Sequence, residues 1–147
     1  MKILLVEDNA GDAMLVRLAL AEASATVNLY IARDGEQALD LIENTDFHPS
    51  LIILDLNIPR IPGSALLERW QGRHIPVVVF SSSQNDAERA HVLALGAREF
   101  VHKPTDLDAF TNAVCGIVER WGEDRHGSAR TQPSQSDLAW DVTPFSC

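Results

Sequence analysis

Five short apolar segments that alternate with helical patterns constrain this chain more than any other feature. The segments cover residues 3–6, 27–31, 51–54, 77–80 and 99–101, and each is typical of a buried strand. Apolar residues recur at helical spacing between and after them, as in Leu15, Val16, Ala19 and Leu20. Strict alternation of strands and helices requires right-handed crossovers and a parallel sheet with helices on both faces. We therefore predict a flavodoxin-like, doubly wound α/β fold with five parallel strands in the order 2-1-3-4-5.

Short polar residues mark the expected helix ends. Asp12, Asp34 and Asp106 are placed at helix starts, where a side-chain oxygen accepts hydrogen bonds from the first turn. Gly96 is placed where a helix ends, because glycine adopts the backbone conformation of a C-terminal cap without strain.

The helical periodicity of apolar residues ends near Gly122. Beyond this point glycine, serine and proline interrupt any periodicity, yet Leu138, Trp140 and Phe145 are more apolar than a solvated linker needs. We predict one domain over residues 1–121 and a tail over 122–147 that is either disordered or docked on a partner protomer.

Composition narrows the classes of partner. A net charge of −9 opposes binding to DNA or to an anionic membrane surface, because both carry negative charge. The sequence contains no apolar run of the roughly 20 residues that a membrane helix needs, so a soluble, cytoplasmic protein is expected. Cys115 and Cys147 lack the spacing of a metal site or a disulfide framework and are expected to be reduced thiols.

Polar side chains stand at the end of four predicted strands. Glu7 and Asp8 follow the first strand, Asp55 ends the third, Ser81 closes the fourth and Lys103 closes the fifth. Parallel strands point their carboxyl ends to one edge of the sheet, where doubly wound folds bind ligands. Taken singly, each residue could be a turn or surface residue. Their joint placement instead predicts a divalent-cation site that accepts a tetrahedral dianion.

The residue types indicate the chemistry of this site. Clustered carboxylates repel one another unless a cation neutralises them, and Mg²⁺ is the hard ion that oxygen ligands favour. Asp55 would then bind the ion through one oxygen and attack phosphorus with the other, while Ser81 and Lys103 stabilise the transferring group. Asn57 is open to two interpretations: its backbone carbonyl could reach the metal, or its side chain could position a hydrolytic water.

The chain resembles the receiver domain of two-component response regulators over residues 1–121. The resemblance rests on Leu4-Leu5-Val6-Glu7-Asp8-Asn9, Asp55-Leu56-Asn57-Ile58-Pro59 with Gly63, Val79-Phe80-Ser81-Ser82, Gly96-Ala97 and Phe100-Val101-His102-Lys103-Pro104. It implies Mg²⁺-dependent phosphoryl transfer from a histidine kinase to Asp55. Asp8, Asp55 and the Asn57 carbonyl would hold the ion, with Glu7 assisting through water. Ser81 would be the switch hydroxyl, Phe100 the switch aromatic, and Lys103-Pro104 would carry a cis peptide bond.

A narrower resemblance is to single-domain regulators that partner bacterial phytochromes, although Pro62 replaces an acidic residue that is common in the family. Such a protein is a phosphoacceptor and not an enzyme acting on a separate substrate. Output would come from protein contacts, including a homodimer through the last helix and the tail, because Phe110, Val114, Ile117, Val118 and Trp121 exceed one core-facing stripe.

Two alternatives remain open. The first is a phosphorelay intermediate or phosphate sink, which would pass its phosphoryl group to another histidine. The second, from another class, is a Mg²⁺-dependent phosphohydrolase with an aspartyl-phosphate intermediate. Such an enzyme needs an acid/base aspartate two residues past the nucleophile, where this chain has Asn57.

Overall fold

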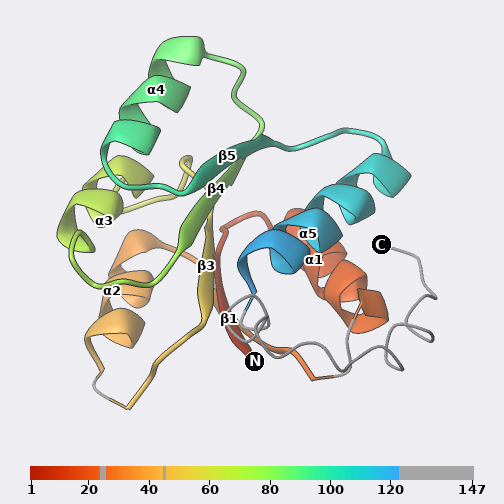
Figure 1. Cartoon of the computed structure of the whole chain (residues 1–147), viewed down its shortest axis with the longest axis horizontal. Helices are drawn as coiled ribbons and strands as arrows, with labels where there is room; N and C mark the ends of the chain where they lie inside the picture. The colour runs from red at the N-terminus through yellow and green to blue at the C-terminus, as the bar shows by residue number, and fades with distance from the viewer. Residues whose placement is uncertain (24–25, 45, 123–147) are drawn as a thin grey trace.

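The computed structural model describes residues 1–23, 26–44 and 46–122 of the chain. Strands and helices alternate throughout (Figure 1). The strands are β1 (Lys2–Val6), β2 (Asn28–Ala32), β3 (Leu51–Leu54), β4 (Val77–Ser81) and β5 (Glu99–His102). The helices are α1 (Ala10–Ala23), α2 (Gly35–Glu43), α3 (Gly63–Arg69), α4 (Asp86–Ala94) and α5 (Leu107–Trp121).

The five strands form one parallel sheet in the order β2-β1-β3-β4-β5, which confirms the predicted topology. The register aligns the carboxyl ends of neighbouring strands. Val6 of β1 lies opposite Leu54 of β3, and Ser81 of β4 lies opposite His102 of β5. Because Glu7, Asp55 and Lys103 each come directly after one of these strands, the register brings all three to the same edge of the sheet.

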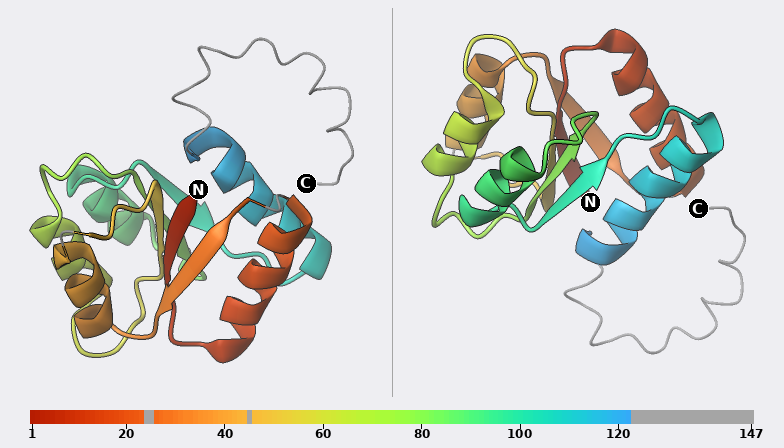
Figure 2. Two further views of the ribbon diagram at one scale, coloured as in Figure 1. Left: turned by 90° about the horizontal axis from the view of Figure 1, so that it is seen from below. Right: turned by 90° about the horizontal axis from the view of Figure 1, so that it is seen from above.

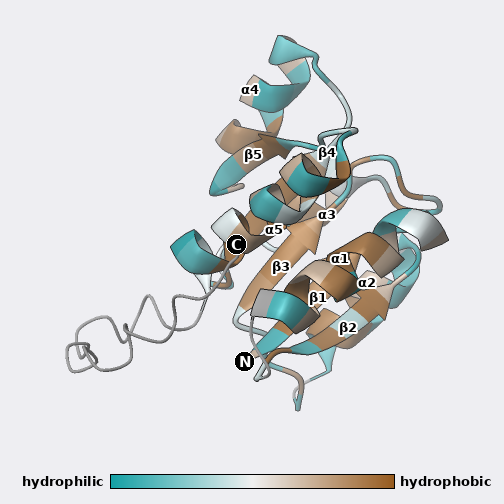
Figure 3. Cartoon of the chain, turned by 90° about the vertical axis from the view of Figure 1, so that its right-hand side faces the viewer, coloured by the Kyte–Doolittle hydropathy of each residue, from teal (hydrophilic) through white to brown (hydrophobic). Residues whose placement is uncertain are grey.

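Helices cover both faces of the sheet (Figure 2). One face packs against α1 and α5 through side chains such as Ile53, Phe80 and Ile117, and the other face packs against α2, α3 and α4. The central strand β3 is apolar along its whole length because both faces of the sheet are covered (Figure 3).

The predicted surplus of apolar surface on the last helix is wrong. Phe110, Val114 and Ile117 are at most 3% exposed, and Val118 and Trp121 are partly buried against the same core. The α5 face of an open parallel sheet is broad, so the helix needs a wide apolar stripe. Leu107, at the start of α5, is the large apolar residue of this helix that stays exposed.

The helix caps agree with the prediction at three of four positions. Asp34 accepts a hydrogen bond from the Gln37 backbone, and Asp106 accepts one from the Ala109 backbone. Gly96, with a φ of +116°, follows the end of α4. The prediction is wrong for Asp12, because the side chain of Asn9 accepts from the Asp12 backbone N–H at 2.9 Å. The Asp12 carboxylate is therefore free for another contact.

Two further predictions differ from the structure. The described residues contain no cis peptide bond, so the cis form implied for Lys103-Pro104 is wrong, in keeping with the intrinsic preference of X–Pro bonds for trans. Cys115 is not a free cysteine in the structure, so the expected free thiol at this position is wrong. Cys147 and the tail residues 123–147 lie outside the described residues.

No helix in the described ranges is long and apolar enough to cross a membrane.

A pair of glycine substitutions tests the packing that positions the site. Gly35→Ala should lower the free energy of unfolding by about 1–3 kcal/mol, because its methyl group would lie 2.5 Å from the Ile61 Cβ and carbonyl oxygen. Gly116→Ala is the control, since its methyl group would meet only the flexible end of Arg120. Better helix propensity should then raise stability by about 0.5–1 kcal/mol. Urea unfolding followed by circular dichroism measures both, and equal effects would contradict the packing.

Candidate functional site

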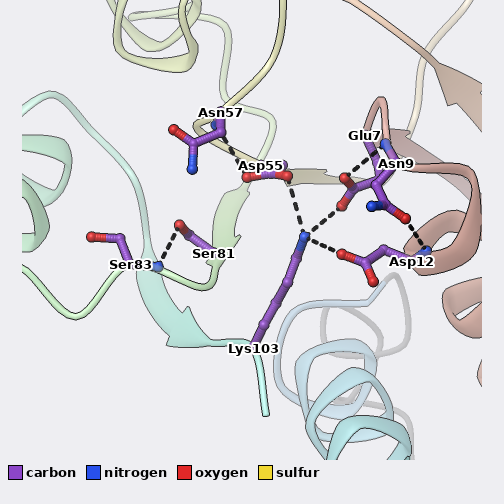
Figure 4. A network of polar contacts seen from close by, with 8 residues as sticks. All are labelled: Glu7, Asn9, Asp12, Asp55, Asn57, Ser81, Ser83 and Lys103. Atoms are coloured by element: carbon purple, nitrogen blue, oxygen red, sulfur yellow. Dashed lines mark hydrogen bonds and ion pairs between the residues drawn. The ribbon is translucent and has the colours of Figure 1, made fainter. Parts of the chain in front are cut away.

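The polar residues predicted from the strand ends gather at one edge of the sheet (Figure 4). Glu7, Asp55, Ser81 and Lys103 are all buried, at 1%, 6%, 0% and 8% exposure. They are the only charged or polar residues buried to this degree in the described part of the chain. Asp8 is exposed beside them. A buried charge is stable only when it is paired, so these groups depend on one another.

The ammonium of Lys103 is the centre of the site. Its Nζ lies 2.7 Å from Glu7 Oε1, 2.9 Å from Asp12 Oδ2 and 3.2 Å from Asp55 Oδ2. An ammonium has three N–H donors, and three carboxylates accept them. The lysine thereby connects the end of β5 to the ends of β1 and β3 and to the first turn of α1.

This arrangement shifts two pKa values. Burial alone would lower the pKa of Lys103, but hydrogen bonds to Glu7 and Asp12 and the charge of Asp55 outweigh it and raise the pKa well above its ordinary value. Burial raises the pKa of Glu7 from 4.5 to about 7, where the hydrogen bond from Lys103 opposes the rise and the nearby Asp55 adds to it. Glu7 therefore titrates near neutral pH unless a cation binds beside it.

Backbone groups orient the carboxylates. Asp55 Oδ1 accepts the Asn57 backbone N–H at 3.1 Å, so each oxygen of Asp55 has its own partner. Glu7 Oε2 accepts the Asn9 backbone N–H at 3.2 Å. The Ser81 hydroxyl oxygen, at the end of β4, accepts the Ser83 backbone N–H at 3.1 Å. These contacts hold the site's oxygens at the strand ends.

Three carboxylates can approach one cation. Oxygens of Glu7, Asp8 and Asp55 lie within 4.8 Å of one another. With Asp12, the site holds four carboxylates and one ammonium, so it carries an excess of negative charge. Oxygen ligands in this number are the donor set that hard divalent cations prefer. The predicted residues Glu7, Asp8 and Asp55 thus fit a divalent cation.

Two other predicted residues lie at the margin of the site. Asn57 is exposed and follows Asp55 by two residues, so its backbone belongs to the same loop. Phe100 on β5 is half-buried and lines a shallow pocket with Ser83, Arg89 and His102. The structure places Phe100 and Ser81 on adjacent strands and leaves their assigned roles as predictions.

Asp12 is the site residue that the sequence interpretation missed. Its position at a helix start suggested a cap, whereas its carboxylate contacts Lys103. One signal was available: the helix leaves the same sheet edge as Glu7, so its first turn lies next to the strand ends.

Comparisons with known proteins agree with this geometry. Residues 3–115 match the family model described as response regulator receiver domain. The chain is 31% identical to the probable methanogenesis regulatory protein FilR2 of Methanothrix harundinacea, over 81% of this chain and 82% of the relative. It is 32% identical to response regulator Rcp1 of Synechocystis, over 82% and 88% of the two chains. It spans about half the length of other curated relatives, which are transcriptional regulators.

Solved structures show the same fold. The Mn²⁺-bound form of Rcp1 aligns with a TM-score of 0.75 at 33% identity, covering 83% of this chain and 94% of that one. The phosphorylated cyanobacterial phytochrome response regulator RcpA aligns with a TM-score of 0.77 at 34% identity and the same coverage. The family model covers most of the domain that carries the site. The chain therefore belongs to the response regulator receiver domain family.

Proposed function

We propose that this chain is a response regulator that accepts a phosphoryl group from a histidine kinase on Asp55 in a Mg²⁺-dependent reaction and signals through protein contacts in the cytoplasm. The position of the Asp55 carboxylate supports this most. It is 6% exposed and lies between the Asn57 backbone N–H and the Lys103 ammonium. A carboxylate held in this way is oriented for attack on phosphorus beside a positive charge.

The proposed transfer step depends on Mg²⁺ and exchanges one bond to phosphorus for another. An Asp55 oxygen forms a bond to phosphorus while the bond from phosphorus to the kinase histidine nitrogen breaks, and the electron pair leaves with that nitrogen. Lys103 and the Ser81 hydroxyl offset charge on the phosphoryl oxygens. Asp8, Asp55 and the Asn57 carbonyl would hold Mg²⁺, with Glu7 acting through water. When bound, the ion would neutralise the excess of carboxylates.

Phosphorylation would act as a switch. A dianion on Asp55 would favour an arrangement in which Ser81 and Phe100 move inward and the surface of α4, β5 and α5 changes. Because Phe100 lines a shallow pocket between β5 and the segment before α4, its movement would reshape that surface. A partner that binds one arrangement better than the other would read the signal.

The kinase we propose is of the bacterial phytochrome type. Similar proteins support this, since RcpA is described as a phytochrome response regulator and another similar structure as a bacteriophytochrome response regulator. A role as phosphorelay intermediate or phosphate sink uses the same chemistry. A phosphohydrolase is disfavoured because Asn57 occupies the position of the acid/base aspartate.

The phosphoacceptor has a direct test. Incubation with acetyl phosphate and Mg²⁺ should add one phosphoryl group to the wild-type chain, because the Asp55 carboxylate lies beside the Lys103 ammonium and is oriented by the Asn57 backbone N–H. Asp55→Asn should abolish labelling, measured as intact mass. Asp40→Asn removes the same charge from the exposed side of α2 and is the matched control. Persistent labelling of Asp55→Asn would move the nucleophile to another residue.

Metal binding should depend on pH through Glu7. Its carboxyl has a pKa of about 7 without a cation, so Mg²⁺ must displace a proton below that pH. Affinity measured by calorimetry should rise about fivefold from pH 6 to pH 7 and about tenfold in all by pH 8, where it levels off, since one proton is released.

Two variants separate the roles of the acidic pair in this titration. Glu7→Gln should flatten the pH dependence, because no carboxyl at this position remains to titrate. Asp8→Ala should weaken binding far more than Glu7→Ala at every pH, because only Asp8 is proposed to contact the ion directly. Equal losses for both alanine variants, or a pH-independent wild type, would contradict these assignments.

We also propose a homodimer through the last helix and the tail. Support comes from exposed apolar side chains on α1 and α5, where Met14, Leu18 and Leu107 are 51%, 54% and 58% exposed. Covering such side chains on a partner would stabilise an assembly by removing apolar surface from water.

Sedimentation of the full chain at high micromolar concentration tests this dimer. A dimer is expected, and Leu107→Gln or truncation after Trp121 should weaken it without reducing Asp55 labelling. Leu93→Gln, at an exposed leucine of α4, is the control and should leave association unchanged. A wild-type monomer, with or without phosphorylation, would exclude the dimer.

A further inference from the structure

We propose that Asp12 is a positioning residue for phosphoryl transfer, which holds the Lys103 ammonium so that one of its N–H donors stays directed at Asp55. The inference rests on the proposed function and adds to it a carboxylate that neither accepts the phosphoryl group nor belongs to the proposed metal ligands. Asp12 would set how fast Asp55 is phosphorylated and how long the product lasts.

The three N–H donors of Lys103 are divided among three carboxylates. Glu7 and Asp12 take two of them in short contacts of 2.7 Å and 2.9 Å, and Asp55 takes the third at 3.2 Å. When the phosphoryl group is present, only the Asp55 contact must be exchanged for a contact with a phosphoryl oxygen. The other two contacts can persist, so the ammonium need not be repositioned during the reaction.

The Lys103 side chain reaches carboxylates on distant elements. Lys103 follows β5, and two strands, β4 and β3, separate β5 from β1. Its flexible four-carbon stem therefore crosses the sheet edge before it meets Glu7 beyond β1 and Asp12 in α1. These two carboxylates fix the tip from the far side. Without Asp12, one anchor would remain on that side.

Asp12 is itself held in place. The Asn9 side chain accepts a hydrogen bond from the Asp12 backbone N–H. Gly11 leaves space for the Asn9 side chain, since a Cβ at residue 11 would lie 3.2 Å from Asn9 Oδ1. The next residue, Ala13, is buried at 4% exposure against the sheet. The first turn of α1 thus presents the Asp12 carboxylate to Lys103 as a fixed acceptor, with the side chain 32% exposed.

Removing the Asp12 charge should have two opposite effects. Repulsion of a dianionic phosphoryl donor falls, which favours the reaction, and Lys103 loses an anchor, which disfavours it. The positioning role requires that the second effect dominates when the lysine is present. It also requires that only the first effect remains when the lysine is absent. A double-mutant cycle between Asp12 and Lys103 separates the two.

The experiment measures labelling by acetyl phosphate with saturating Mg²⁺ for Asp12→Asn, Lys103→Ala and the double variant. At saturating donor, Asp12→Asn should slow phosphorylation of Asp55 by about 3–10-fold, as expected for loss of alignment without loss of a reacting group. In the Lys103→Ala background the same change should cause no loss, or a small gain. Asp12→Glu, which keeps a carboxylate on a longer stem, should fall between Asp12→Asn and wild type. Asp40→Asn is the charge-matched control and should behave as wild type.

Several outcomes would overturn the inference. A wild-type rate for Asp12→Asn would show that Lys103 needs no second anchor, and an equal loss in both lysine backgrounds would show that Asp12 acts independently of Lys103. If Lys103→Ala labels too slowly to follow, the affinity for beryllium fluoride, a mimic of the phosphoryl group, completes the same cycle. If Asp12→Asn fails to unfold cooperatively, Asp12→Ser takes its place. Failure of the wild-type chain to label, or labelling of Asp55→Asn, would instead refute the proposed function.

Discussion

The buried ammonium of Lys103 is the interaction on which the rest of the site depends. A charge that is 8% exposed would be strongly destabilising alone, and carboxylates from β1, β3 and α1 satisfy it together. Each of these carboxylates would be costly to bury without the lysine. The site therefore forms only when strands far apart in the sequence have assembled, because the lysine lies 96 residues from Glu7 and 48 from Asp55.

The sheet order supplies the geometry for these contacts. β1 and β3 are neighbours in the sheet, at the point where the strand order reverses. The residues that follow Val6 and Leu54 therefore lie next to each other. Continuous apolar strands such as β3 can be buried on both faces because helices cover each side (Figure 1). The polar residues stand where each apolar run ends, so packing of the core determines the positions of the charged groups.

The sequence predicts the fold and most of the site because strand periodicity and strand ends are local signals. Glu7, Asp8, Asp55, Ser81 and Lys103 each follow or close an apolar run, and the parallel topology brings them together. The role of Asp12 depends on where a distant lysine reaches, which no local pattern encodes. Likewise, the width of the apolar stripe on α5 becomes intelligible only when the area of sheet that it covers is known.

The charge balance of the site explains how a local reaction could affect the whole domain. The site holds four carboxylates and one ammonium, and so has an excess of negative charge. A cation or a change at Asp55 would redistribute the three hydrogen bonds of Lys103. Those hydrogen bonds join β5 to the first turn of α1, and α1 packs beside α5 through the core that they share. Asp12 therefore places a helix outside the sheet in direct contact with the lysine that also contacts Asp55. A phosphoryl group on Asp55 would be sensed both through Ser81 at the end of β4 and through the anchor in α1.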